Sequence, residues 1–135
     1  MPSSIFELTS SVAVAPISAK SRPVKAASDE ATTLAAAECV QGIVTMTPST
    51  GRALTTPTGA LLKTFFDGRL EIGASFELTV VNVAAATHAI TLTAAASGIT
   101  LGGVAGMATV AAAASATYVF VCTAVGTPAF TVYRK

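Results

Sequence analysis

One stretch of eight residues, Phe76 to Val83, constrains most strongly what this chain can fold into. Apolar residues stand at positions 76, 78 and 80, and the polar residues Glu77 and Thr79 stand between them. A β-strand turns successive side chains to opposite faces, so this alternation predicts a strand with one buried face. Val81 and Val83 make the second face apolar towards the end, which is typical of a strand covered on both sides. We therefore expect a central strand here.

The rest of the chain repeats short runs of this kind with turn-forming residues between them. We expect further strands at 43–46, 52–55, 88–93, 98–102, 107–111, 115–122 and 129–133. An amphipathic pattern predicts a short helix at 60–66, and an Ala-rich stretch allows another at 34–38. This pattern predicts an all-β fold, an antiparallel β-sandwich of the jelly-roll type with one or two short helices. Its predicted core consists of Leu61, Phe65, Phe76, Leu78, Val80, Ile90, Leu92, Phe120, Phe130 and Val132.

Residues 1–28 are predicted to form an extended arm in front of a single sandwich domain at 29–135. Ser and Ala dominate the arm, three prolines interrupt it, and no periodic apolar face emerges. Two interpretations stay open: a solvated tail, as termini usually are, or a segment that becomes ordered against a neighbouring subunit. In the second case the contacting residues are Ile5, Phe6, Leu8, Val12, Val14, Ile17, Lys20, Arg22 and Lys25.

The distribution of charge narrows the classes of partner. Only 11% of the residues are charged, the net charge is +1, and Trp is absent. Such a chain has no field to attract nucleic acid or an anionic membrane, so we expect neither as a partner. Between Glu77 and Arg134 there is no Asp, Glu, Lys or Arg at all. Because protein interfaces are depleted of charge, this region predicts a homo-oligomer. The alternative is that the polar side chains of Thr, Ser and Asn keep the surface hydrated without a partner.

A membrane-spanning segment is disfavoured, although Val104–Val125 is long enough and uncharged. It contains Gly, Ser and Thr, and its residues 118–121 favour a strand. The N-terminus also makes a poor secretory signal, because no Lys or Arg precedes its weak apolar run at 12–15. We expect synthesis in the cytosol.

No pattern in the sequence predicts catalysis, a metal site or a cofactor. Cys39 and Cys122 lack the spacing of zinc ligands, and Cys122 sits in an apolar strand. His88 is the only His, and no G-x-S-x-G motif accompanies it. Three carboxylates lie close in the sequence and are more simply the solvated rim of a sheet than an acid–base pair: Asp67, Glu71 and Glu77.

A family resemblance supplies the functional expectation. It is carried by six runs in a fixed order and spacing: Arg52–Leu62, Gly73–Asn82, Ile90–Thr93, Gly98–Gly103, Thr109–Ala111 and Phe130–Arg134. From about Ala31 onward the chain resembles the small β-sandwich virion proteins of tailed bacteriophages, of the capsid-decorating or cement type. The resemblance implies a non-enzymatic homotrimer on the outer capsid surface that stabilises the head by binding across major capsid protein subunits.

Two other functional classes remain as alternatives. A tail, fibre or head-fibre attachment module of the virion uses similar β-domains. A carbohydrate-binding sandwich is disfavoured, because Trp is absent and there are only two Tyr.

Overall fold

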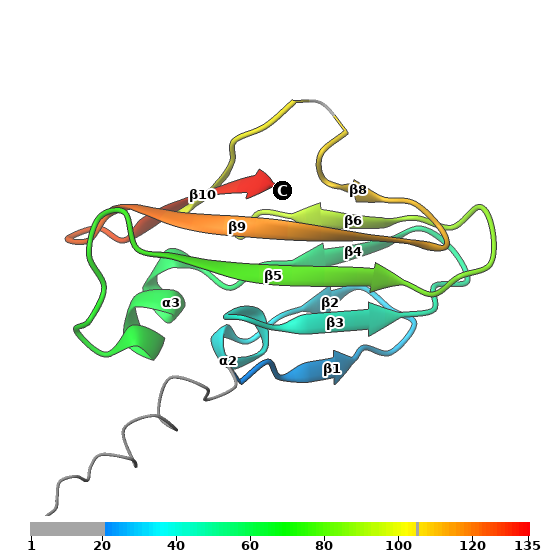
Figure 1. Ribbon diagram of the computed structural model, residues 1–135, viewed down its shortest axis with the longest axis horizontal. Coiled ribbons are helices and arrows are strands. Elements are labelled where there is room, and N and C mark those ends of the chain that lie inside the picture. Colours follow the sequence, from blue (N-terminus) through cyan, green and yellow to red (C-terminus); the bar gives the residue numbers. More distant parts are fainter. Residues whose placement is uncertain (1–20, 105) are drawn as a thin grey trace, which may run out of the picture.

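Strands dominate the computed structural model, which describes residues 21–104 and 106–135 and arranges them in two sheets (Figure 1). The six-stranded sheet has the order β1 (Val24–Ala26), β3 (Ile43–Met46), β5 (Ser75–Asn82), β9 (Ala114–Ala124), β10 (Ala129–Arg134) and β7 (Ile99–Leu101). The four-stranded sheet has the order β2 (Thr32–Thr33), β4 (Arg52–Thr55), β6 (Ile90–Thr93) and β8 (Thr109–Val110). Two short helices, α2 (Ala36–Cys39) and α3 (Gly59–Phe66), contact each other.

From β1 to β6 the chain passes alternately from one sheet to the other. Neighbours within a sheet are therefore every second strand of the chain, and they run parallel: β1–β3–β5 in one sheet and β2–β4–β6 in the other. The β7–β10 pair is also parallel, whereas β5–β9, β9–β10 and β6–β8 are antiparallel. The predicted sheet-dominated fold is found, but the predicted antiparallel jelly-roll pairing holds for these three pairs alone. Alternation along one strand reports burial and carries no information on the direction of its neighbour.

The core lies between the two sheets, and eight of the ten predicted core side chains are in it. Each of these eight is at most 5% exposed. The stack of Phe76 on Phe120, with ring centroids 4.7 Å apart, lies at its centre, and Phe130 meets Phe76 edge-on. The eight are Phe76, Leu78, Val80, Ile90, Leu92, Phe120, Phe130 and Val132.

The prediction was wrong for Leu61 and Phe65, which are 54% and 43% exposed on α3. The helix begins at the Thr58 cap, where the threonine hydroxyl accepts a hydrogen bond from the Leu61 amide. Leu62 is fully buried, and Phe66 packs against Phe76. A helix this short at the edge of a core buries one narrow stripe, and residues one position earlier rotate by about 100° into solvent.

The boundary of the arm is also corrected. The predicted arm reached residue 28, but β1 is an edge strand of the six-stranded sheet and pairs in parallel with β3. Lys25, within β1, forms an ion pair of 2.9 Å with Glu38 of α2. A strand of three residues is too short to show a period, which is why the sequence did not predict it.

A buried amide joins the two sheets at the end of β5. Asn82 is 1% exposed, and its Nδ2 donates to the carbonyls of His88 (2.8 Å) and Val110 (3.0 Å). Its Oδ1 accepts from the Ala84 amide at 3.0 Å. Buried polar groups need partners, and this side chain hydrogen-bonds three backbone groups, one of them on β8 of the opposite sheet. No helix within the described part of the chain is long and apolar enough to cross a membrane.

Candidate binding surfaces

The outer face of the six-stranded sheet carries apolar side chains in register across the strands. Val24 on β1 is the register partner of Ile43 on β3, and Val119 on β9 is the partner of Tyr133 on β10. Thr, Ser and Ala occupy most of the positions between these apolar residues. We call this surface the valine face and define it by its apolar residues Val24, Ile43, Val81, Val119, Val121 and Tyr133.

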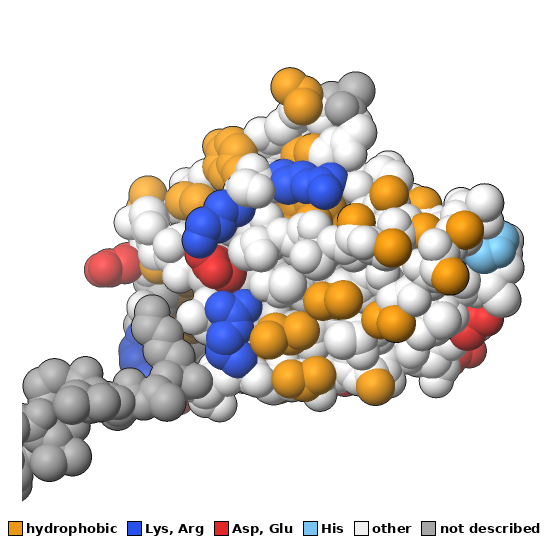
Figure 2. Space-filling view, turned by 45° about the vertical axis from the view of Figure 1, so that its right-hand side comes forward, with side chains coloured by type: hydrophobic (Ala, Val, Ile, Leu, Met, Phe, Trp, Pro, Cys, Tyr) orange, Lys and Arg blue, Asp and Glu red, His pale blue; other side chains and the backbone are white. Residues whose placement is uncertain are grey.

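The valine face carries one charged cluster, formed by Arg22, Glu77 and Lys135. Glu77 lies between the two cations: its Oε2 is 2.9 Å from Lys135 Nζ, and its Oε1 is 3.7 Å from Arg22 Nη1. Arg22 Nη2 also donates to the Thr79 hydroxyl at 3.3 Å. The hydrogen bond from Lys135, aided by the charge of Arg22, lowers the pKa of Glu77 below its ordinary value of 4.5. Glu77 thus pairs with both cations of the cluster. Charged side chains occupy a limited part of this side of the molecule (Figure 2).

The outer face of the four-stranded sheet is of a different kind. Thr33, Thr55 and Thr93 are register partners on β2, β4 and β6 and form one row. Thr91 and Thr109, partners on β6 and β8, form the next row with Ala53. We call these five threonines the threonine face. It presents hydroxyl and methyl groups and, on the described strands, no aliphatic side chain larger than Ala.

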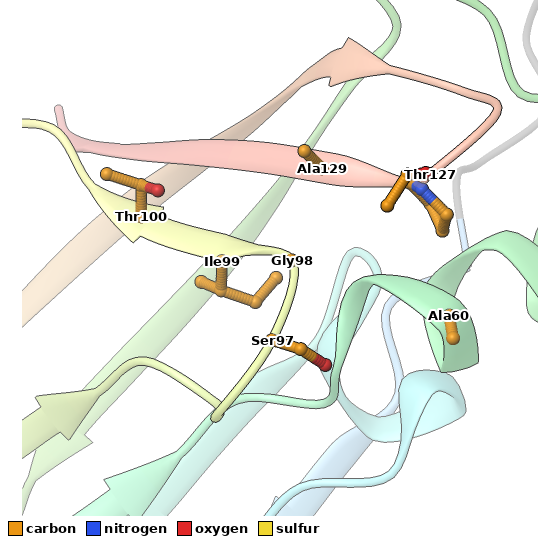
Figure 3. A pocket seen from close by; sticks show the side chains of 8 residues that line it. Ala60, Ser97, Gly98, Ile99, Thr100, Thr127 and Ala129 are labelled. Atoms are coloured by element: carbon orange, nitrogen blue, oxygen red, sulfur yellow. The ribbon is translucent and has the colours of Figure 1, made fainter.

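A pocket of about 370 Å³ lies where the beginning of β7, the β9–β10 turn and α3 meet (Figure 3). The backbones pack closely at this junction. A Cβ added to Gly59 would lie only 2.3 Å from the Pro128 carbonyl oxygen. Its lining contains the side chains of Ser97, Thr100 and Thr127 but no ionisable group. The pocket therefore offers neither a general base nor a charged anchor for a ligand.

A second pocket, of about 230 Å³, adjoins the charged cluster and is lined in part by Arg22, Gln41 and Glu77. Gln41 is committed there, because its Oε1 accepts the Glu77 backbone amide at 2.8 Å. Its two ionisable groups, Arg22 and Glu77, pair with each other, while the buried Arg22 Nε has no hydrogen-bond partner among the described residues.

The residues considered for chemistry from the sequence lie apart. Cys39 and Cys122 are both buried as free thiols, and burial raises the pKa of Cys39 to about 12. A thiol with so high a pKa stays protonated and is a poor nucleophile. His88 lies in the loop before β6, where its backbone carbonyl accepts a hydrogen bond from Asn82 and its backbone amide donates to the Ala86 carbonyl.

The three neighbouring carboxylates do not form an acid–base pair. Asp67 and Glu71 are exposed around the loop after α3, whereas Glu77 is paired on β5. Among residues 21–104 and 106–135, no three His, Cys, Asp or Glu side chains come together in a way that could hold a metal ion.

The predicted arm contacts are divided between the two parts of the chain. Arg22 and Lys25 belong to the folded domain through their pairs with Glu77 and Glu38. Local sequence pattern could not distinguish these two basic residues from the rest of the arm, because their acidic partners are distant along the chain. The others lie outside the described residues: Ile5, Phe6, Leu8, Val12, Val14, Ile17 and Lys20.

No family model, no curated protein and no solved structure matches this chain.

Proposed function

We propose that this chain is a non-enzymatic structural protein of a tailed-bacteriophage virion that decorates the outer capsid surface and stabilises it. It does so by binding across major capsid protein subunits, as a homotrimer of the kind that the resemblance implies. One observation carries the proposal: the valine face and the threonine face lie on opposite sides of one sandwich, and the strands after β5 contribute no charged residue to either before Arg134.

Two faces with little charge, one without a charged side chain and one with a single paired cluster, suit a protein that bridges neighbours. A flat sheet face without charge can be buried without stripping water from unpaired ions, whose burial is costly. A molecule with two such faces contacts two neighbours at once, and each contact raises the effective concentration for the next. A protein that binds the assembled state alone stabilises that state by RT ln(1 + L/Kd), where L is the concentration of the free protein.

The arrangement of polar groups supports binding over chemistry. Several charged side chains of the described domain form ion pairs, such as Arg52 Nε with Asp29 Oδ1 at 2.8 Å, and Arg134 donates to the backbone carbonyls of Met107 and Thr109. That pairing lowers the pKa of the Asp29 carboxyl below its usual range, so this carboxylate is not available as a base near neutral pH.

Capsid binding is tested with heads that lack the protein. Purified full-length chain is mixed with such heads, the heads are pelleted, and their thermal stability is measured with and without the bound chain. We expect saturable co-sedimentation and an increase in the temperature at which the heads disrupt. A double variant of the threonine face, Thr55→Lys/Thr91→Lys, tests whether that face takes part, with Lys63→Ala on α3 as a matched control.

Labelled antibody on whole virions then separates the two virion locations. Label spread over the head supports decoration. Label confined to the tail, or to fibres projecting from the head, contradicts decoration and supports the attachment-module alternative.

A further inference from the structure

We infer that the valine face is a self-association surface, covered by a second copy of this chain. The inference deepens the proposed function and rests on it for one point only, that the protein works as part of an assembly. It assigns the valine face to the protein itself and leaves the threonine face free for a different neighbour.

The first argument is the chemical contrast between the two faces. The threonine face carries a hydroxyl group at each of its five positions, with Thr55 half-buried and the other four exposed, and can stay hydrated. The valine face instead places Val24 (66% exposed) beside Ile43, and Val119 beside Tyr133 (46% exposed). β-Branched and aromatic side chains in adjacent rows of a sheet are what a covered face requires. A monomer would keep this apolar surface in water permanently.

The second argument is area. Six strands about 4.8 Å apart span roughly 24 Å, and the eight residues of β5 extend for about 26 Å. Their product is on the order of 600 Å², against about 800 Å² per partner in a standard stable interface. The face alone therefore comes close to what a lasting complex needs, and modest contacts at its margins would supply the rest.

The third argument is the charge on the valine face, which indicates what kind of molecule covers it. Glu77 pairs with both Arg22 and Lys135, so the cluster carries one positive charge in excess, and an anionic partner would have to compete with this carboxylate for it. The remaining described positions of the face carry no charge, so a highly charged surface would lose hydration over most of the contact without finding an opposite charge. A second copy can cover the face with uncharged strand surface of its own. It meets the requirement without a new ion pair.

The inference is tested by placing charge on the face in the full-length protein. In Val81→Lys/Val119→Lys, two cations are added to the valine face; in the matched control Thr55→Lys/Thr91→Lys, the same charge is added to the threonine face. Sedimentation velocity over a wide concentration series measures assembly, and thermal unfolding verifies that each variant is folded. We expect wild type and control to be oligomeric at micromolar concentration, and the valine-face variant to dissociate with a Kd raised by at least about 100-fold.

A thiol-labelling measurement covers the case in which the lysine variant fails to fold. Val81→Cys places one reactive thiol on the valine face, and Thr91→Cys places one on the threonine face, while the natural Cys39 and Cys122 are buried. The rate of maleimide labelling is followed as protein concentration rises. We expect labelling at position 81 to slow as copies assemble and labelling at position 91 to stay constant.

Each outcome decides the inference separately from the proposed function. A wild-type chain that is monomeric at every concentration, or an oligomer that the lysine pair leaves intact, overturns the inference even if the chain binds heads. A chain that assembles through the valine face but never binds heads upholds the inference and contradicts capsid decoration.

Discussion

Phe76 and Phe120 lie opposite each other on β5 and β9, register partners whose rings stack with centroids 4.7 Å apart and planes 17° from parallel. Replacing either ring by a methyl group removes buried apolar contact and leaves a cavity in a close-packed core. We expect Phe76→Ala and Phe120→Ala each to lower the free energy of unfolding by about 3–5 kcal/mol, measured by denaturant titration. Thr79→Ala on the opposite face of β5 is the control, with an expected loss within about 1 kcal/mol. Equal losses would contradict the register described above.

The position of that stack follows from the sequence, since alternation in residues 76–80 already assigned inward and outward side chains to β5. The bounds of most strands, the hairpin of β9 and β10, and helix α3 were likewise predictable from local pattern. Strand direction was not, because parallel and antiparallel neighbours bury the same residues. The orientation of Leu61 and Phe65 depended on how deeply α3 sits against the sheets, which is a tertiary property.

The surfaces were predictable to a different degree. The absence of charge after Glu77 is visible in the sequence and indicated an interface. Which of the uncharged residues share a face depends on which strands share a sheet, and the alternation of the chain between two sheets is hidden from any local pattern. The charged cluster needed residues 22, 77 and 135 to meet in space.

Asn82 provides a test of how the two sheets are joined. Asn82→Ala removes a hydrogen-bond partner from two carbonyls and one amide that are held close to the core, at His88, Val110 and Ala84. Each buried polar group left without a partner is destabilising, so we expect a total loss of about 2–5 kcal/mol in the free energy of unfolding. Thr91→Ala, at an exposed site on β6, should change it by no more than about 0.5 kcal/mol. A similar small loss in both variants would show that water replaces the amide.

The pKa of Glu77 reports the integrity of the charged cluster. Because the folded pKa lies below the ordinary value of 4.5, the favourable pairing is fully present above that value and is lost as pH falls through the folded pKa. An NMR titration of the side-chain carboxyl should therefore give a midpoint below 4.5. Lys135→Ala removes the largest cause of the shift, so we expect the midpoint to move upward. Thr131→Ala, on the same face without charge, should leave it in place, and an unmoved midpoint in Lys135→Ala would argue that the ion pair is absent in solution.

The N-terminal arm gives two truncations with opposite expectations. Deleting residues 1–28 removes β1 together with the pairs of Arg22 with Glu77 and Lys25 with Glu38, so it should lower the thermal unfolding temperature. Deleting residues 1–20 leaves every described strand in place, and we expect thermal unfolding of the isolated protein to stay nearly unchanged.

The shorter truncation also tests the predicted contact of the arm with a neighbouring subunit. If the apolar residues of positions 5–17 and Lys20 bind capsid protein, the chain lacking residues 1–20 should be retained more weakly on expanded heads in a co-sedimentation assay. Raising the salt concentration should reproduce only the part of this loss that comes from Lys20, because high ionic strength screens charge and leaves apolar contacts intact. Equal retention of the truncated and full-length chains at low salt would leave the arm as a solvated tail and place all capsid contacts on the folded domain.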